Sequence, residues 1–410
     1  MGWLATSSDS RPPTDTLPAG ERIDEVDNLR RSAPSSWPVA AHVYNPSTLQ
    51  PMSEGMLLKV AAFSYCMNEA DRMRVARRGS FTTQAVWWRG GAIQWRMAHA
   101  ADARGLTVGG RRWVIFHRYW HRGAEAPPEA QRPPPCRTKA SHAPTCPLTC
   151  RSVGAMYIAE LNATNTTAVA LRHRRAACVE KNWIPWTPDG RTLLLTQQLE
   201  PHVVLRCNQL SGRCLRTISL LNRCPAQLAW GCAARHGGCQ PGSTTPRGGT
   251  PLVEVRPGLL VGVAHMWHPI RSVQTAFSVR RRYMHAFYAV RPWPPYCVTN
   301  VSRWFRFADE FGDERDFIQM ALGAALLPAT DELLVTYGVA DCVPMRLRLP
   351  VRRVLTLLQG THDEATTVGD NVHEEVARFS KWASRGQEPP AASCLRSQPR
   401  HHRTWQNGRR

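Results

Sequence analysis

Short apolar runs bounded by turn-forming residues recur through the middle of the chain, and this pattern most constrains the fold. They include RRWVIFHRYW, AMYIAEL, RTLLLTQQL, HVVLRCN, PLVEV, GLLVGVAHMW, RRYMHAFYAV, DELLVTYGV and MRLRLP. Their length and their alternating or continuous apolar character are typical of β-strands, and the Gly, Pro and Asn residues between them are typical of turns. The pattern therefore predicts an all-β body.

Several of these runs are spaced as antiparallel hairpins. RTLLLTQQL and HVVLRCN are separated by Glu200-Pro201, and PLVEV and GLLVGVAHMW by Arg256-Pro257-Gly258. The helical patterns of 10 to 15 residues that a parallel α/β sheet needs between its strands are lacking. A body of about 320 residues made of hairpins, without a division into two parts, favours a propeller of about five blades over a sandwich.

The composition of the flanking regions sets the domain boundaries. We expect a disordered leader, a five-bladed β-propeller with two surface insertions, a short helical appendage and a disordered basic tail. These parts cover residues 1–38, 39–360 (insertions 124–150 and 225–249), 361–383 and 384–410. No window is apolar enough for a transmembrane segment, and the N-terminus lacks a signal-peptide pattern. This leaves a cytoplasmic location as the default, with a secretory lumen open if the natural chain begins earlier.

Charge and cysteine usage exclude several functions. The net charge is +21, yet only four of the 52 basic residues are lysines, an imbalance typical of GC-rich codons rather than of a nucleic-acid surface. The 13 cysteines contain no C-x-x-C pair, so a zinc site is not predicted, and one or two disulfides are expected among Cys207, Cys214, Cys224, Cys232 and Cys239. No P-loop, G-x-S-x-G or H-E-x-x-H motif is present, and no cofactor or metal is expected.

Five segments combine polar or charged side chains with Pro, Gly or Trp, at about one segment per expected blade. They are Asn45-Pro46-Ser47, Ala101-Asp102-Ala103-Arg104, Glu180-Lys181-Asn182-Trp183-Ile184-Pro185, Gly248-Gly249-Thr250-Pro251 with His265, and Tyr337-Gly338-Val339-Ala340-Asp341. Equivalent positions of successive propeller blades converge on the central axis. We therefore expect these segments to meet around one site.

In this order, the five segments resemble motifs of the five-bladed β-propeller carbohydrate enzymes, particularly the β-mannoside phosphorylases and the β-1,2-mannosyltransferases. The resemblance covers roughly residues 42–358. The sequence departs from the family pattern at Ala101 and Ala103, where the family has Glu and Pro, and at Asn182, where many relatives have Asp.

The resemblance implies an inverting glycosyltransferase or glycoside phosphorylase that acts on β-mannoside-type linkages. It assigns Asp102 as the general acid, which protonates the glycosidic oxygen directly or through a sugar hydroxyl. It implies partners of two kinds: an oligosaccharide or glycan acceptor, and phosphate, a sugar phosphate or a nucleotide sugar. The expected phosphate ligands and sugar contacts are Arg104, Lys181, His265, His202, Asn45, Ser47, Asn182, Tyr337 and Asp341, with Trp183 or Tyr337 offering a ring face.

Other interpretations stay open at this stage. A glycosidase would use Glu180 or Asp341 as a base opposite Asp102, at a carboxyl separation of about 6.5 to 9.5 Å. A propeller that binds glycans or proteins without catalysis is the alternative from another class. Among single residues, His265 also fits a core histidine and His202 a structural hydrogen bond in a hairpin.

Overall fold

The computed structural model describes most of the predicted propeller. It describes residues 15–17, 20–24, 29, 42–47, 55–61, 83–121, 152–161, 167–173, 181–200, 202–219, 246–275, 278–307 and 318–359. The predicted insertion 124–150, the helical appendage 361–383 and the basic tail 384–410 lie outside these residues. Of the insertion predicted at 225–249, residues 246–249 are described, and they contain a strand of the propeller body.

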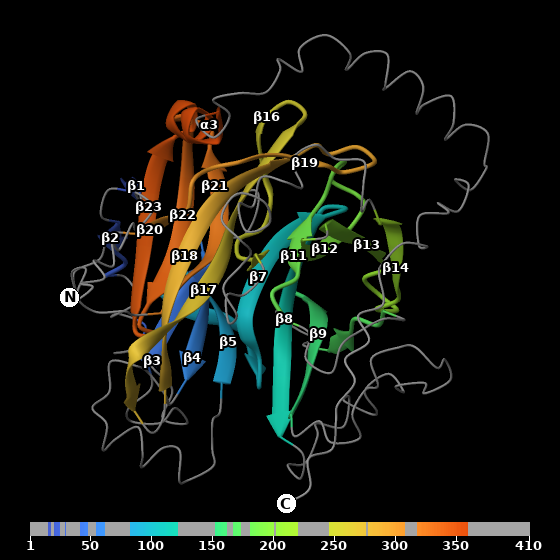
Figure 1. Ribbon diagram of the computed structural model, residues 1–410. Coiled ribbons are helices and arrows are strands. Elements are labelled where there is room, and N and C mark those ends of the chain that lie inside the picture. The colour runs from blue at the N-terminus through green and yellow to red at the C-terminus, as the bar shows by residue number, and fades with distance from the viewer. Residues whose placement is uncertain are drawn as a thin grey trace, which may run out of the picture. The chain divides into compact units, whose positions relative to one another are not determined.

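Five sheets form the blades of a ring, which confirms the predicted all-β propeller (Figure 1). Blade 1 consists of β3 (His42–Ser47), β4 (Met56–Ala61), β5 (Thr83–Arg89) and β6 (Ala92–Ala98). Blade 2 consists of β7 (Ala101–Val108), β8 (Arg111–His121), β9 (Ser152–Glu160) and β10 (Ala168–Ala170). Blade 3 consists of β11 (Ile184–Trp186), β12 (Leu194–Leu199), β13 (His202–Cys207) and β14 (Cys214–Ser219).

The last two blades include short strands from the N-terminal region. Blade 4 consists of β15 (Arg247–Gly248), β16 (Val253–Arg256), β17 (Leu259–Thr275), β18 (Ser278–Val290), β19 (Val298–Val301), β20 (Phe305–Phe307) and β1 (Asp15–Leu17). Blade 5 consists of β21 (Gln319–Leu327), β22 (Glu332–Val339), β23 (Val343–Pro350) and β2 (Glu21–Arg22). Both hairpins predicted from the sequence, β12–β13 and β16–β17, are antiparallel pairs.

The hydrophobic core lies between neighbouring blades. One cluster joins Leu57 and Trp87 of blade 1 to Phe116 and Tyr157 of blade 2. Similar clusters join blades 2 and 3, blades 3 and 4, and blades 4 and 5. Because a blade packs against a neighbour on each face, β22 is buried almost throughout. This two-sided burial explains why DELLVTYGV reads as a continuous apolar run rather than an alternating one.

Residues 15–17 and 20–24, within the leader 1–38 that was predicted to be disordered, take part in the fold. β2 pairs antiparallel with β23, and β1 pairs parallel with β20. Two hydrogen bonds also join blade 5 to blade 1: Thr336 Oγ1 donates to the carbonyl of Pro46 at 2.8 Å, and Ser47 Oγ donates to the carbonyl of Leu322 at 3.0 Å. Short strands such as β1 and β2 carry little periodicity, so the sequence pattern did not reveal them.

One helix is described, α3 (Val351–Gln359), directly after β23. Val351, Val354 and Leu358 are its buried residues, a spacing that places them on one face. This segment was predicted to belong to the propeller body 39–360, yet it is helical in the structure. Among the described residues, no helix is long and apolar enough to cross a membrane.

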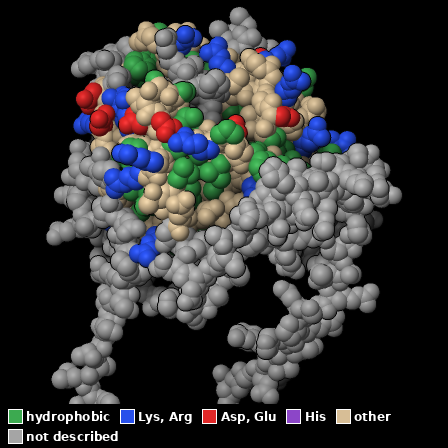
Figure 2. All heavy atoms as spheres, turned by 90° about the horizontal axis from the view of Figure 1, so that it is seen from above, with side chains coloured by type: hydrophobic (Ala, Val, Ile, Leu, Met, Phe, Trp, Pro, Cys, Tyr) green, Lys and Arg blue, Asp and Glu red, His purple; other side chains and the backbone are tan. Residues whose placement is uncertain are grey.

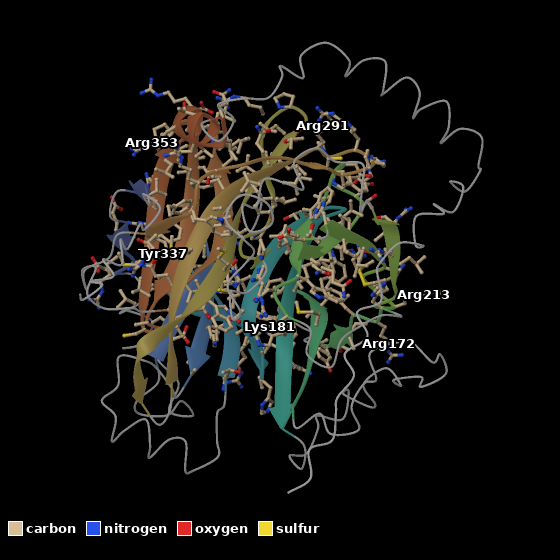
Figure 3. The ribbon with its side chains drawn as sticks, viewed as in Figure 1. Arg172, Lys181, Arg213, Arg291, Tyr337 and Arg353 are labelled. Carbon is tan, nitrogen blue, oxygen red and sulfur yellow. A yellow bond between two sulfur atoms is a disulfide. The ribbon has the colours of Figure 1, made fainter. Side chains whose placement is uncertain are left out.

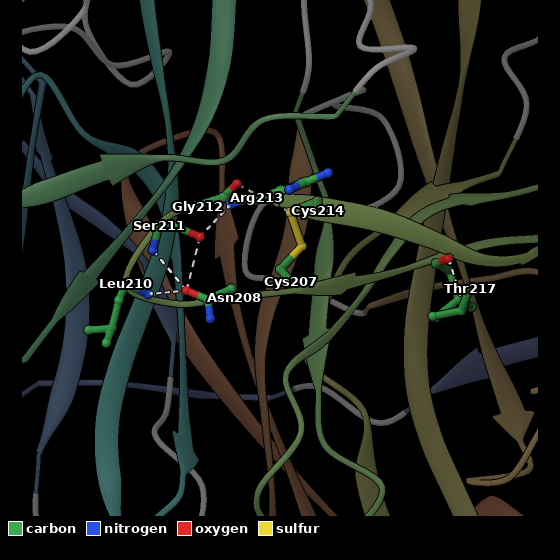
Figure 4. The surroundings of a disulfide bond; sticks show 9 residues. Cys207, Asn208, Leu210, Ser211, Gly212, Arg213, Cys214 and Thr217 are labelled. Atoms are coloured by element: carbon green, nitrogen blue, oxygen red, sulfur yellow. Dashed lines mark hydrogen bonds between the residues drawn. A yellow bond between two sulfur atoms is a disulfide. The ribbon is translucent and has the colours of Figure 1, made fainter.

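A disulfide closes the β13–β14 hairpin (Figure 4). Cys207 and Cys214 are directly opposite each other in the register of the two strands, and their Cα atoms are 4.1 Å apart. Asn208 orders the turn between them, since its Oδ1 accepts hydrogen bonds from the backbone amides of Leu210 and Ser211. The pair confirms a disulfide among the five cysteines named from the sequence.

Candidate functional site

The predicted motifs fall on or beside the first strand of successive blades. Residues 45–47 lie on β3, 101–104 on β7, 184–185 on β11 and 248 on β15. β7 contacts β3, β11 and β21, and β21 contacts β3, so the first strands of the blades lie side by side. Residues 337–339 lie instead on β22, the second strand of blade 5, and residues 340–342 form the turn that follows it.

Asp102 lies within a cluster of basic side chains. Lys59 Nζ on β4 is 3.5 Å from Asp102 Oδ1, and His117 Nδ1 on β8 is 3.6 Å from Asp102 Oδ2. The exposed fractions of these three side chains are only 12 to 15%. A carboxylate that is nearly buried among cations interacts with them more strongly than a surface ion pair would.

The surrounding charges keep Asp102 ionised. Burial by itself would raise the pKa of its carboxyl group, but the positive charges of Lys59, Arg104 and Lys181, and that of His117 when it is protonated, outweigh it and hold the pKa well below the usual range. For His117, burial has the larger effect and lowers the pKa to about 4, despite the attraction of Asp102. At neutral pH the cluster therefore holds an ionised carboxylate and an uncharged imidazole.

Hydrogen bonds from the side chain of Arg104 connect three of the predicted motifs. Its guanidinium donates to the carbonyl oxygens of Gly249, Asp102 and Gly248 and to Asn182 Oδ1, at 2.5 to 3.4 Å. The side chain has no exposed surface. The sequence predicted that Arg104 would hold a phosphate. Because its Nε, Nη1 and Nη2 all donate to protein oxygens, it does not present a pair of free donors to a bound phosphate in this structure.

The glycines of the fourth motif are needed for close packing of the chain. A Cβ atom at Gly248 would collide with the backbone of Asn182 and the side chain of Ile184, and one at Gly249 would collide with the carbonyl of Val263. Thr250 Oγ1 accepts a hydrogen bond from the amide of Val263 at 2.9 Å. These contacts explain the Gly-Gly-Thr sequence, because side chains larger than glycine at the first two positions would keep β15 away from its neighbours.

Lys181 and His265 interact electrostatically with residues of the cluster around Asp102. Lys181, labelled in Figure 3, precedes β11 and is exposed. Its charge acts on both Asp102 and His265. His265 is 2% exposed and lies opposite Arg247 on one side and His285 on the other. Burial, followed by the charges of His285, Arg104, Arg247 and Lys181, keeps its pKa well below the usual value.

Three residues predicted to contact the substrate are packed in the interior. Tyr337 has no exposed surface and stacks on Phe307, with 4.1 Å between ring centroids, and Trp183 is 1% exposed within the core between blades 2 and 3. Both rings are buried in this structure, and their contact with a sugar stays a prediction. His202 is buried, 3.2 Å from Thr196 Oγ1, and hydrogen-bonds to the backbone of Tyr296; both contacts fit the structural interpretation.

The remaining predicted residues are placed as follows. Ser47 is fully buried and bonded to β21, as described above, and the side chain of Asn45 lies outside the described part. Asp341 lies half-buried in the turn after β22. The contacts that define the Asp102 cluster thus join the second, third and fourth motifs.

Backbone strain marks several of these positions. Seven non-glycine residues among those described have positive φ, and four of them belong to the predicted motifs: Asp102 (49°), Asn182 (62°), Ala340 (54°) and Asp341 (48°). Asn and Asp tolerate this left-handed region better than other side chains do, but Ala does not. Residues held in such conformations concentrate at functional sites.

Sequence reasoning missed two members of the cluster, Lys59 and His117. Both lie on second strands, β4 and β8, within strand patterns that show no motif. One signal could have identified Lys59: the chain contains four lysines, and two of them, Lys59 and Lys181, act on Asp102. Among the described residues, no group of His, Cys, Asp and Glu could hold a metal ion.

Several solved structures resemble this ring of blades. A β-1,2-mannobiose phosphorylase from Listeria innocua is 11% identical with a TM-score of 0.47, and covers 83% of this chain and 99% of its own. A GDP-Man-dependent mannosyltransferase from Leishmania mexicana is 8% identical with a TM-score of 0.45, covering 80% and 94%. A putative glycoside hydrolase from Parabacteroides distasonis is 10% identical with a TM-score of 0.42, covering 83% and 94%. These likenesses concern the course of the backbone.

No protein-family model matches the sequence, and no curated protein matches it.

The buried histidines predict marked acid sensitivity. The pKa is lowered by burial to about 4 for His117 and His202 and to about 3 for His285. The unfolded chain binds protons at these side chains below about pH 6.5, but the folded chain does not until its lower pKa values are reached. The stability that each neutral histidine contributes is therefore complete above about pH 6.5 and lost as the pH falls towards 3 to 4.

Urea unfolding at pH 7.5, 6.0 and 5.0 measures this effect. Each such histidine should lower the free energy of unfolding by up to about 1.4 kcal/mol per pH unit in this window. His285→Phe, which places an apolar ring beside Phe305 and Phe307, should reduce the acid slope by that amount. An acid slope that is equal in wild type and His285→Phe would contradict this prediction.

Proposed function

We propose that the protein is a carbohydrate-active enzyme, an inverting glycosyltransferase or glycoside phosphorylase that acts on β-mannoside-type linkages. Its partners would be an oligosaccharide or glycan acceptor and phosphate, a sugar phosphate or a nucleotide sugar. The β-mannoside part of this proposal rests on the five motifs and their order in the sequence. The phosphate part rests on the charges around Asp102.

The observation that carries the proposal is a nearly buried carboxylate next to an excess of positive charge. The neighbours whose charges lower the pKa of Asp102 are Lys59, His117, Arg104 and Lys181, and three of these are permanent cations. Transfer to or from a phosphate group requires cations that hold the anion against repulsion, and it requires a group that moves a proton at the glycosidic oxygen. The cluster contains both kinds of group.

In this proposal each residue has a distinct role. In the synthetic direction the ionised Asp102 accepts the proton of the acceptor hydroxyl, directly or through a sugar hydroxyl, and in the reverse direction it returns that proton to the glycosidic oxygen. Lys59 and Lys181 attract the phosphate group by their charge. Arg104 is a positioning residue, because it fixes the backbone of Asp102 and the amide of Asn182 through its hydrogen bonds. Asn45 and Asp341 keep their sequence-predicted roles in this proposal. Ser47, His202, His265 and Tyr337 are buried, and they reach a substrate only if its binding rearranges the packing described above.

Incubation of the purified chain with GDP-mannose or mannose 1-phosphate and short β-mannan acceptors tests the proposal. We expect extension of the acceptor with release of GDP or inorganic phosphate, measured by mass spectrometry and a phosphate assay. Release of free mannose from β-mannan in the absence of phosphate would instead indicate the glycosidase alternative. Binding of the acceptor without turnover of any donor would support the non-catalytic alternative and overturn the proposal.

A further inference from the structure

Two exposed arginines lie side by side where the chain after β10 meets blade 3. Arg172, two residues after β10, is the parallel bridge partner of Arg213, which precedes β14 (Figure 3). The amide of Arg172 donates to the carbonyl of Gly212 at 2.7 Å, and the amide of Cys214 donates to the carbonyl of Arg172 at 2.9 Å. These backbone bonds keep two like charges on adjacent positions, an arrangement that is unfavourable by itself.

The hairpin that carries Arg213 is fixed by several constraints. The disulfide between Cys207 and Cys214 closes it, and the Asn208 side chain orders its turn. Gly212 has a φ of 66°, and a Cβ atom there would collide with the carbonyl oxygen of Ala170. The turn therefore packs directly against the end of β10. A backbone that is ordered before binding loses little conformational entropy when a ligand binds.

One side of this hairpin is exposed and carries both charged and apolar side chains. Leu215 is directly opposite Arg206 in the register of β13 and β14, and Cys207 and Cys214 form the next pair. The two cysteines are buried in the core between blades 2 and 3. Because side chains alternate along a strand, Arg206, Arg213 and Leu215 point to the opposite side, where all three are exposed.

Arg172 lies on the same side, because it is the bridge partner of Arg213. The resulting hairpin face consists of Arg172, Arg206, Arg213 and Leu215. Its three guanidinium groups form no hydrogen bond or ion pair with any described residue. β13, β14 and the turn between them contain no acidic residue. Asp189, an acid of the same blade, accepts hydrogen bonds from the amides of Arg191 and Thr192 in its own turn.

Positive charge alone does not mark a site on this protein, because Lys and Arg side chains are spread over the described surface in Figure 2. The hairpin face differs because it includes an apolar side chain, Leu215, which is 58% exposed. Among the described residues, the other exposed large hydrophobic side chain is Leu210 at the tip of the same hairpin (Figure 4). Arginine combined with apolar surface is typical of protein interfaces, whereas an anionic polysaccharide would gain little from a leucine.

We infer that the hairpin face binds an acidic segment of a partner polypeptide. A carboxylate of the partner lies between Arg172 and Arg213, accepts hydrogen bonds from both and removes their repulsion. An apolar side chain of the partner covers Leu215, and a further acid pairs with Arg206. This binding involves none of the residues of the cluster around Asp102, and it is independent of the proposed function.

Selection from a library of random short peptides, carried out with the full chain, tests the inference. We expect the selected peptides to combine acidic residues with Leu, Ile or Phe. The Kd of a synthetic selected peptide is then measured by fluorescence anisotropy at physiological salt. The double variant Arg172→Gln/Arg213→Gln should bind it about tenfold or more weakly than wild type, because two charged hydrogen bonds are lost.

A matched double variant separates this site from general charge attraction. Arg96→Gln/Arg348→Gln removes the same net charge from exposed positions on β6 and β23. It should change the Kd by less than about twofold, because salt screens distant surface charges. The substitutions at Arg172 and Arg213 concern exposed side chains that repel each other, so the midpoint of urea unfolding should stay equal or rise.

The two exposed leucines test the apolar part of the inference. Leu215→Ser should weaken binding of the selected peptide by about threefold or more, because contact with an apolar side chain is lost. Leu210→Ser removes the same side chain from the tip of the hairpin, outside the hairpin face, and should change the Kd by less than about twofold.

Three results would overturn the inference. The first is that wild type selects no peptide that Arg172→Gln/Arg213→Gln fails to bind. The second is an equal loss of affinity in Arg96→Gln/Arg348→Gln, which would indicate attraction by net charge. The third is binding of a heparin oligosaccharide that depends on Arg172 and Arg213 but not on Leu215, with no peptide selected. That result would assign the hairpin face to an anionic polysaccharide instead.

Discussion

Replacement of Asp102 by Asn is expected to reduce kcat/KM for mannosyl transfer by about 10³-fold. A positioned acid or base contributes about 10² to 10⁴-fold to such reactions, and Asn can neither donate nor accept the proton. The backbone at this position is left-handed, with φ of 49°, and Asn is one of the residues that suit it. Acceptor affinity should therefore remain close to that of wild type, and steady-state kinetics together with acceptor titration measure both quantities.

Asp331→Asn is a matched control for this substitution. Asp331 is also an aspartate with positive φ, 52°, but it lies in an exposed turn and forms an ion pair with Arg256 at 2.7 Å. Loss of that exposed pair should change stability little, because solvent screens it, and should leave kcat/KM unchanged. Full activity of Asp102→Asn would show that another group moves the proton and would reject Asp102 as the acid.

Replacement of Arg104 by Met is expected to lower the free energy of unfolding by about 3 to 5 kcal/mol. The substitution leaves the carbonyl oxygens of Gly248 and Gly249 and the amide oxygen of Asn182 without their hydrogen-bond donor, in a region that water does not reach. It also removes a positive charge near the ionised carboxylate of Asp102. Removing one partner of a buried polar network typically has a cost of this size.

Urea unfolding measures this loss, and two further variants define its cause. Arg104→Lys keeps the charge but cannot reach four oxygens at once, so its loss of stability should be intermediate. Arg96→Met on the exposed face of β6 removes an arginine without buried partners and should change stability by less than about 0.5 kcal/mol. A cost below about 1 kcal/mol for Arg104→Met would contradict the structural role of this residue.

The strands and hairpins of the propeller could be predicted because they depend on local patterns. The run RTLLLTQQL and the turn before HVVLRCN are visible in the sequence, and β12 and β13 pair as expected. β1 and β2 could not be predicted in this way. A strand of two or three residues such as β2 acquires its conformation from hydrogen bonds to β23, more than 300 residues further along the chain.

The candidate site was predictable only in part. Asp102, Arg104, Lys181 and Asn182 were identified from motifs, and the structure brings their charges or hydrogen bonds together. Lys59 and His117 were not identified, because each lies on a strand whose pattern is fully explained by packing. Tyr337 was expected to contact sugar, but a tyrosine in a motif and a tyrosine in a core have the same local sequence.

The sequence by itself determined the all-β character, the hairpins and the residue types able to move a proton or hold an anion, because strand periodicity and side-chain chemistry are properties of short segments. Only the tertiary structure decided that Lys59 and His117 flank Asp102, that Arg104 donates to three motifs and that Tyr337 is buried. Those facts depend on which strands of separate blades lie side by side. Charge interactions and burial depend on distance in space, and distance in space is set by the closure of the ring.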